Sequence, residues 1–190
     1  MDEKIRVAVM AGTTRAQRES IKAARYVFEF GKQIPEIDVV FVDPLDFNFP
    51  GDGNDPEGKD PRYTKITELA DAFFIITPEY NHSFPGSLKR MLDSELKNYV
   101  HKPVALGGVS NGGWGGVRAV EALVTSVREM GLAVTFTSVY FPKVQDLFNE
   151  DGSLKEENRE RYERNLTSAY NELIWMAKAL KWGRENLSSN

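Results

Sequence analysis

The sequence contains no cysteine and only two histidines. The absence of cysteine excludes disulfide bonds, iron–sulfur clusters, thiolate metal sites and cysteine nucleophiles. His82 and His101 do not show the spacing of a metal-binding motif. We therefore expect neither a metal site nor a thiol-based active site.

Blocks of positive charge and long apolar runs are also missing. The net charge is −4 and the basic residues form no cluster, which does not favour a nucleic-acid partner. No apolar run approaches the length of about 20 residues that a membrane span needs. The amino terminus is charged and leads directly into an apolar segment, unlike a secretory signal. We expect a cytoplasmic protein with no membrane partner.

The composition is that of a folded globular protein. Of the 190 residues, 41% are hydrophobic and 27% are charged, which is ordinary for a globular domain. The linker-like stretch of residues 50–61 lies inside the pattern of strands and helices, not between two units. We therefore expect a single domain spanning residues 1–190.

Short apolar runs alternate with segments of helical periodicity. The expected strands are residues 5–10, 39–42, 72–76, 104–109 and 133–139. The expected helices are residues 21–31, a segment within 61–70, segments that follow Pro85 and Gly116, and residues 154–181. This alternation predicts a parallel sheet with right-handed crossovers. Five strands in a chain of this length suit a three-layer α/β fold of the flavodoxin-like type, with strand order 2-1-3-4-5 and helices on both faces.

A proline-bounded loop follows the third expected strand. Pro78 restricts Thr77 to an extended conformation and ends the strand, and Pro85 precedes the next helix. In open α/β sheets, ligands bind at the carboxyl ends of the strands. A rigid loop at this place can offer backbone N–H and C=O groups to a flat ring.

The loop after the first strand is rich in hydrogen-bond donors. It leads into a helix, whose first N–H groups favour an anion. Its hydroxyl and guanidinium groups are those of Thr13, Thr14, Arg15, Arg18 and Ser20. Arginine can bind a phosphate through two parallel hydrogen bonds, although an ordinary polar surface loop explains the pattern equally well. Only Gly12 of the G-x-G-x-x-G dinucleotide motif is present, which argues against a Rossmann NAD domain.

The loop after the fourth strand, residues 110–116, contains four glycines. Glycine permits close approach of the backbone to a ligand, but a flexible loop without a ligand has the same composition. Trp114 could stack on a flat ring or anchor a subunit contact.

These three loops resemble one known family. The pattern P-E-Y-N-x-x-x-P-G-x-L-K-x-x-L-D that starts at Pro78 resembles the isoalloxazine-binding loop of the NADPH-dependent FMN reductases, which are flavodoxin-like proteins. The first loop is similar to that family's phosphate loop, with Thr13 in place of serine. The third is similar to its S-G-G-x-x-G-G-x-R-A segment, with Asn111 in place of glycine. The resemblance covers residues 5–139.

The resemblance implies a set of FMN-binding residues. Those expected at the phosphate are Thr13, Arg15, Arg18 and Ser20. Those expected along the flavin ring are Pro78, Glu79, Tyr80 and Asn81. The third loop is expected to contribute Ser110, Asn111, Gly112 and Gly113. No catalytic side chain is implied, because the flavin carries the chemistry; His82 is expected in a supporting role.

The resemblance also implies an activity. NADPH or NADH would deliver a hydride to flavin N5, and a quinone, azo dye, metal oxyanion or free flavin would then accept the electrons. It implies a homodimer or homotetramer as well, with residues 85–99 and 117–130 as candidate contacts. The alternatives are a flavodoxin-like FMN-binding electron carrier without NAD(P)H activity and a relative that binds no flavin. The mild net charge and the arginines of the first loop argue against the electron carrier.

Overall fold

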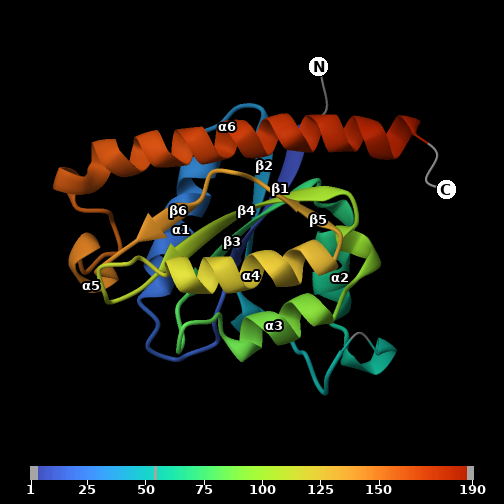
Figure 1. Ribbon diagram of the computed structural model, residues 1–190, viewed down its shortest axis with the longest axis horizontal. Coiled ribbons are helices and arrows are strands. Elements are labelled where there is room, and N and C mark those ends of the chain that lie inside the picture. Colours follow the sequence, from blue (N-terminus) through green and yellow to red (C-terminus); the bar gives the residue numbers. More distant parts are fainter. Residues whose placement is uncertain (1–3, 54, 188–190) are drawn as a thin grey trace.

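The computed structural model describes residues 4–53 and 55–187, which form a three-layer α/β structure around one parallel sheet (Figure 1). The strands are β1 (Ile5–Ala11), β2 (Ile37–Val42), β3 (Ala72–Pro78), β4 (Lys102–Val109), β5 (Leu132–Val134) and β6 (Val139–Phe141). Their order is β2-β1-β3-β4-β5, and β6 also pairs with β4. This order confirms the predicted flavodoxin-like fold.

Helices cover both faces of the sheet. They are α1 (Ser20–Gly31), α2 (Pro61–Leu69), α3 (Gly86–Asp93), α4 (Val117–Glu129), α5 (Val144–Leu147) and α6 (Glu156–Asn186). Three short 3₁₀ turns join them: η1 (Pro44–Asp46), η2 (Pro56–Gly58) and η3 (Lys97–Tyr99). The buried residues of α1 and α6 share one core, and those of α2, α3 and α4 share the other. Within the described residues, no helix is long and apolar enough to cross a membrane.

The central strand β3 separates the two cores. Phe74 and Ile76 face α1 and α6, whereas Phe73 and Ile75 face the opposite layer. A strand that is covered on both faces needs apolar residues at successive positions. Its apolar run therefore fixes β3 in the middle of the sheet, where each large buried side chain contributes roughly 1.5–3 kcal/mol.

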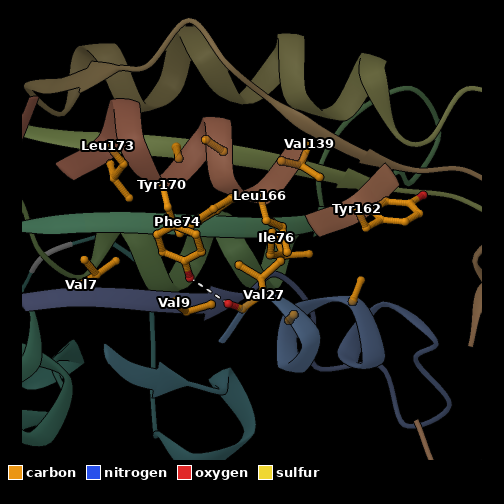
Figure 2. Packing of buried hydrophobic residues seen from close by; sticks show 14 of the residues in the cluster. Val7, Val9, Val27, Phe74, Ile76, Val139, Tyr162, Leu166, Tyr170 and Leu173 are labelled. Carbon is orange, nitrogen blue, oxygen red and sulfur yellow. Dashed lines mark hydrogen bonds between the residues drawn. The ribbon is translucent and has the colours of Figure 1, made fainter. Parts of the chain in front are cut away.

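The long helix α6 packs across the sheet with an aromatic row. The rings of Tyr170 and Phe74 meet edge to face with centroids 5.2 Å apart, and the Tyr170 hydroxyl donates a hydrogen bond to the carbonyl of Val27 at 2.8 Å (Figure 2). Burial raises the pKa of Tyr170, so the hydroxyl stays protonated as this donor. A Cβ at Gly31 would lie 2.6 Å from the same hydroxyl. The glycine at the end of α1 therefore makes room for α6.

The predicted fifth strand is wrong in one respect. Instead of one strand over residues 133–139, β5 and β6 are separated by residues 135–138, of which only Thr135 still donates to β4, at the Val104 carbonyl. Glu172 of α6 accepts hydrogen bonds from the amides of Phe136, at 2.6 Å, and Thr137, at 2.9 Å. These amides bond to a helix carboxylate and not to β4, so the strand breaks although its residues favour β structure.

Candidate functional site

A cavity of about 270 Å³ opens at the carboxyl edge of the sheet. Three loops border it: the first loop (residues 12–19), the second loop (79–85) and the third loop (110–116). The residues that line the cavity are Arg15, Gln17, Arg18, Glu19, Ser20, Pro78, Glu79, Tyr80, Val109, Ser110, Asn111 and Val144. The three loops singled out in the sequence therefore meet at one place.

Close packing joins the first loop to the second. A Cβ at Gly12 would lie 2.8 Å from the carbonyl oxygen of Ile76 and 2.9 Å from the Cα of Thr77. Only glycine lets the end of β1 approach β3 this closely. The hydroxyls of Thr13 and Tyr80 then form a hydrogen bond of 2.9 Å. Thr13 does not line the cavity, but it fixes a residue that does.

Arg18 is engaged within the protein. Its guanidinium binds both carboxylate oxygens of Asp43 at the end of β2, and Nη1 also donates to the carbonyl of Thr13 at 2.5 Å. The side chains of Arg18 and Asp43 are 9% and 8% exposed. The paired N–H groups of Arg18, which were expected to bind the phosphate, are therefore occupied by Asp43. The sequence reasoning did not place Asp43 at the site. Arg18 holds the shape of the first loop.

The other groups of the first loop surround the start of α1. Arg15 is exposed, and its amide donates to the Thr13 hydroxyl at 3.2 Å. Ser20 is the first residue of α1 and is buried beside the cavity. The first N–H groups of a helix have no intrahelical acceptor and attract anions. In α1 the amides of Ile21 and Lys22 donate to the carbonyls of Arg18 and Glu19, so the donor set at this end of the cavity is the Arg15 guanidinium with the hydroxyl and amide of Ser20, which suits a phosphate.

The second loop contains a tight turn. The amide of Tyr80 donates to the Ser83 carbonyl at 2.8 Å, and the Ser83 amide donates back at 3.0 Å. The central residues, Asn81 and His82, have φ angles of 50° and 67°. Positive φ at both positions is the signature of a type I′ turn. The Tyr80 amide is thus used inside the turn, and the amides of Asn81, His82 and Phe84 have no hydrogen-bond acceptor among the described residues.

The third loop combines a fixed end with an open end. Gly116 has a φ of 83°, and a Cβ there would lie 2.5 Å from the amide nitrogen of Val109. In contrast, a Cβ at Gly112 or Gly113 would meet no atom within 4 Å. Packing within the described chain requires glycine at the fixed end only. The open end leaves space beside Asn111 for a ligand to approach the backbone.

Arg118 at the start of α4 connects the second and third loops. Its Nη1 lies 3.4 Å from Oε1 of Glu79 and 3.2 Å from Nε2 of His82. Because a guanidinium can only donate, this contact is a hydrogen bond when Nε2 of His82 accepts. The guanidinium also lies 5.9 Å from the ring centroid of Trp114. The sequence reasoning matched Arg118 to a motif but did not place it at the site.

Glu79 has an incomplete set of partners. Its other carboxylate oxygen, Oε2, is buried and has no hydrogen bond among the residues that the structure describes. A buried polar atom without a partner costs about 1–3 kcal/mol. Such atoms occur where a ligand or a rearrangement completes the site.

Eight of the twelve predicted cofactor-binding residues line the cavity, and four lie next to it. The four are Thr13, Asn81, Gly112 and Gly113. Val144 reaches the cavity from the start of α5, and no sequence pattern pointed to it. Within the described residues, no cluster of histidine and acidic side chains could hold a metal ion.

The sheet order and a donor-lined cavity at its carboxyl edge define a flavodoxin-like protein. The chain belongs to the NADPH-dependent FMN reductase family, whose model matches residues 5–146. As a member of this family it is an oxidoreductase that uses FMN and NAD(P)H.

Individual proteins agree with this assignment. A quinone reductase from Pseudomonas putida is 28% identical over 166 residues, which cover 84% of this chain and 89% of that protein. An NAD(P)H-dependent FMN reductase from Schizosaccharomyces pombe is 30% identical over 150 residues, covering 73% of this chain and 74% of that protein. The structure of the flavoenzyme NAD(P)H:(acceptor) oxidoreductase FerB from Paracoccus denitrificans superimposes with a TM-score of 0.72 at 22% identity, covering 92% and 98% of the two chains. This last similarity concerns the fold.

Proposed function

We propose that the protein transfers electrons from NAD(P)H, through FMN in the cavity, to small organic acceptors of the quinone class. The observation that carries this proposal is the meeting of three loops at one cavity, with a cationic end at α1 and a backbone wall at the second and third loops. Such a cavity suits an elongated ligand with a phosphate at one end and a flat polar ring at the other.

At the phosphate end, the proposal assigns different roles to the two arginines. Arg15 is exposed and close to Ser20 in the cavity wall, so it binds the phosphate directly. Arg18 is held by Asp43 and by the Thr13 carbonyl, so it positions the loop. Ser20 supplies a hydroxyl donor and the first amide of α1, whereas the Thr13 hydroxyl is bonded to Tyr80 and positions the loop.

At the ring end, the proposal relies on backbone groups. The amides of Asn81 and His82 take no part in the hydrogen bonds of their own turn, and Pro78, Glu79 and Tyr80 form the adjoining wall. The residues of the third loop, Ser110, Asn111, Gly112 and Gly113, border the other side. Hydrogen-bond donors near a flavin favour its reduced, negatively charged form.

Bound FMN supplies the redox chemistry, in which NAD(P)H, a proton and a quinone become NAD(P)⁺ and a hydroquinone. The protein binds and orients the two substrates in turn, in the same space, so the steady-state kinetics follow a ping-pong pattern. The acceptor class follows the similarity to the P. putida quinone reductase.

A homodimer is also part of the proposal. Leu96 and Val100, which follow α3, are 47% and 40% exposed. A second copy that packs against this region would cover them. Light scattering of the flavin-loaded protein should give twice the mass of the chain.

The test of the function is an anaerobic titration of the FMN-loaded protein. We expect NADPH to bleach the visible flavin bands, and an added quinone to restore them. Flavin that stays oxidised with NADPH and NADH but bleaches with dithionite would identify an electron carrier instead. A protein that binds no flavin would contradict the proposal entirely.

A further inference from the structure

We propose that Trp114 and Arg118 form a rim subsite that binds the negatively charged group of a flat acceptor. This inference rests on the proposed function and names a class of acceptor for it: aromatic molecules that carry an anionic substituent. Four features of the structure carry the argument. They are the N–H groups of Arg118 without an acceptor, the long Arg118–Glu79 ion pair, the exposed indole of Trp114 and the charge of the residues around the cavity.

Arg118 uses only part of its guanidinium. Both of its hydrogen-bond contacts, to Glu79 and His82, involve Nη1. Among the residues that the structure describes, Nη2 and Nε have no hydrogen-bond partner, and the side chain is 46% exposed. The remaining N–H groups can therefore form the paired hydrogen bonds that arginine makes with carboxylates, sulfonates and phosphates.

The ion pair between Arg118 and Glu79 is weak. Their closest approach is 3.4 Å, compared with 2.7 Å for the Arg62–Asp60 pair elsewhere in the chain. A long contact through one nitrogen does not neutralise the guanidinium as a paired contact does. Arg118 can therefore bind a second anion without first breaking a strong ion pair.

Trp114 supplies the surface for an aromatic ring. Its side chain is among the most exposed large apolar groups of the described chain, at 71%, and Arg118 lies 5.9 Å from its ring centroid. An exposed indole face next to a guanidinium binds flat rings by stacking and anions by the adjacent charge. Because Glu79 lines the cavity and contacts Arg118, this surface adjoins the site of reduction.

The surrounding charge favours an anion, although the whole chain has a net charge of −4. Arg15 lines the cavity, and the backbone of Lys143 is hydrogen-bonded to Gly112 of the third loop at 3.1 Å. Neither forms a salt bridge within the described part of the chain. Two carboxylates, Glu19 and Glu79, also line the cavity, and each is paired with a cation, Glu19 with Lys22 and Glu79 with Arg118. Among the described residues that line the cavity, Arg15 is therefore the cation without a salt bridge, and its charge attracts anions to the opening.

Direct binding can be measured without the redox reaction. In the variant W175F/W182F, which removes two exposed indoles on α6, Trp114 is the remaining tryptophan. We expect naphthalenesulfonate to quench its fluorescence with a saturable isotherm, and the uncharged naphthalenesulfonamide to bind about tenfold more weakly. Adding Arg118→Gln should remove this difference between the two probes.

Turnover gives an independent readout with FMN-loaded protein and saturating NADPH. We expect Arg118→Gln to lower kcat/KM for a naphthoquinone sulfonate about tenfold and for the uncharged menadione less than about twofold. Arg118→Lys should retain part of the preference for the sulfonated quinone, because lysine keeps the positive charge but lacks the paired N–H donors of the guanidinium. The matched control is Arg164→Gln, which removes an exposed arginine of α6 and should change neither acceptor.

Several results would overturn the inference. Equal losses for both quinones would mean that Arg118 acts only by holding Glu79. An unchanged sulfonate preference, or equal binding of the two naphthalene probes, would mean that no anion subsite exists. If neither quinone is reduced although NADPH bleaches the flavin, the acceptor class of the proposed function fails, and the fluorescence titration still decides the rim subsite.

Discussion

Two arginine–carboxylate pairs lie at opposite ends of the cavity, and they differ in burial, in the number of hydrogen bonds and in the distance between the charged groups. Arg18 and Asp43 are almost fully buried and bind through two nitrogens and two oxygens. Arg118 and Glu79 meet through one nitrogen at 3.4 Å, and the arginine is 46% exposed. The same two chemical groups therefore form a rigid support at one end and an adjustable contact at the other.

The difference matches what each end has to bind in the proposed function. A resident cofactor with an invariant phosphate benefits from a loop that is fixed before binding, because less ordering is then needed. NAD(P)H and the electron acceptor bind in turn in the same space, so the residues at the rim of the cavity must be able to exchange one hydrogen-bond partner for another. The predictions below test this contrast, beginning with the largest effect.

Removing the buried arginine should have the largest effect on stability. Arg18→Ala leaves Asp43 buried and without its partner, which typically costs 3–5 kcal/mol. We expect the flavin-free variant to lose about 3 kcal/mol in urea unfolding, and the double variant Arg18→Met/Asp43→Leu to recover much of that loss. Arg118→Ala is the matched control and should lose less than about 1 kcal/mol. Equal losses for Arg18→Ala and Arg118→Ala would contradict the contrast.

Arg15 should act on the cofactor and not on the fold. Arg15→Ala removes a charged donor from the phosphate end, so we expect the Kd for FMN to rise about 10- to 100-fold, equivalent to 1.5–3 kcal/mol. Riboflavin lacks the phosphate, and its affinity should stay the same. Fluorescence titrations of both flavins measure the two effects. If the FMN affinity of Arg15→Ala is unchanged, the phosphate assignment is wrong.

The turn of the second loop should tolerate glycine but not a β-branched residue. Asn81 has a φ of 50°, where a β-branched side chain is strained by about 1–2 kcal/mol. Asn81→Val should therefore lower both stability and flavin affinity, whereas Asn81→Gly keeps the type I′ turn. Thermal unfolding and flavin titration of the two variants provide the comparison. A neutral Asn81→Val would show that the turn does not shape the ring end.

Lys102 is a third cation that extends this comparison, because its ammonium group is buried against backbone carbonyls instead of a carboxylate. Nζ of Lys102 donates to the carbonyls of Thr67, at 2.8 Å, and Glu68, at 3.1 Å, at the end of α2. Burial lowers the pKa of Lys102 to about 8, below the value of about 10.4 in an unfolded chain. Between these values the unfolded chain binds more protons, so Lys102 makes the protein more stable as the pH rises.

Lys102→Met should remove this contribution. The free energy of unfolding of the wild type, measured in urea, should rise relative to that of the variant by up to about 1.5 kcal/mol between pH 8 and about 9.5. Parallel curves for the two proteins across this range would show that Lys102 does not titrate there. Lys97→Met serves as the control, because this lysine is exposed on η3.

The sequence predicted the features that depend on local patterns. The apolar run of β3 and the helical spacing of Leu88, Met91 and Leu92 led to the correct layers, because burial on two faces or on one stripe requires these periodicities. The proline-bounded loop was found because proline restricts the backbone wherever it occurs, and the first loop because its hydroxyl and guanidinium donors are dense in the sequence.

The features that the sequence did not reveal depend on contacts between distant residues. Asp43 lies 25 positions from Arg18, and Glu172 lies 36 positions from the Phe136 amide to which it binds. Nothing in the local pattern of either pair distinguishes it from solvated surface charge. The partner of an arginine is fixed only when the sheet order brings two loops together, which explains why the roles of Arg18 and Arg118 required the structure.

The most direct test of this account is a crystal structure of the FMN-loaded protein. The account predicts the phosphate beside Arg15, Ser20 and the first turn of α1, with the Arg18–Asp43 pair unchanged, and the flavin ring against the Tyr80–Ser83 turn. A flavin bound elsewhere would contradict the site. An Arg18 that leaves Asp43 to bind the phosphate would contradict the division of roles between the two arginines.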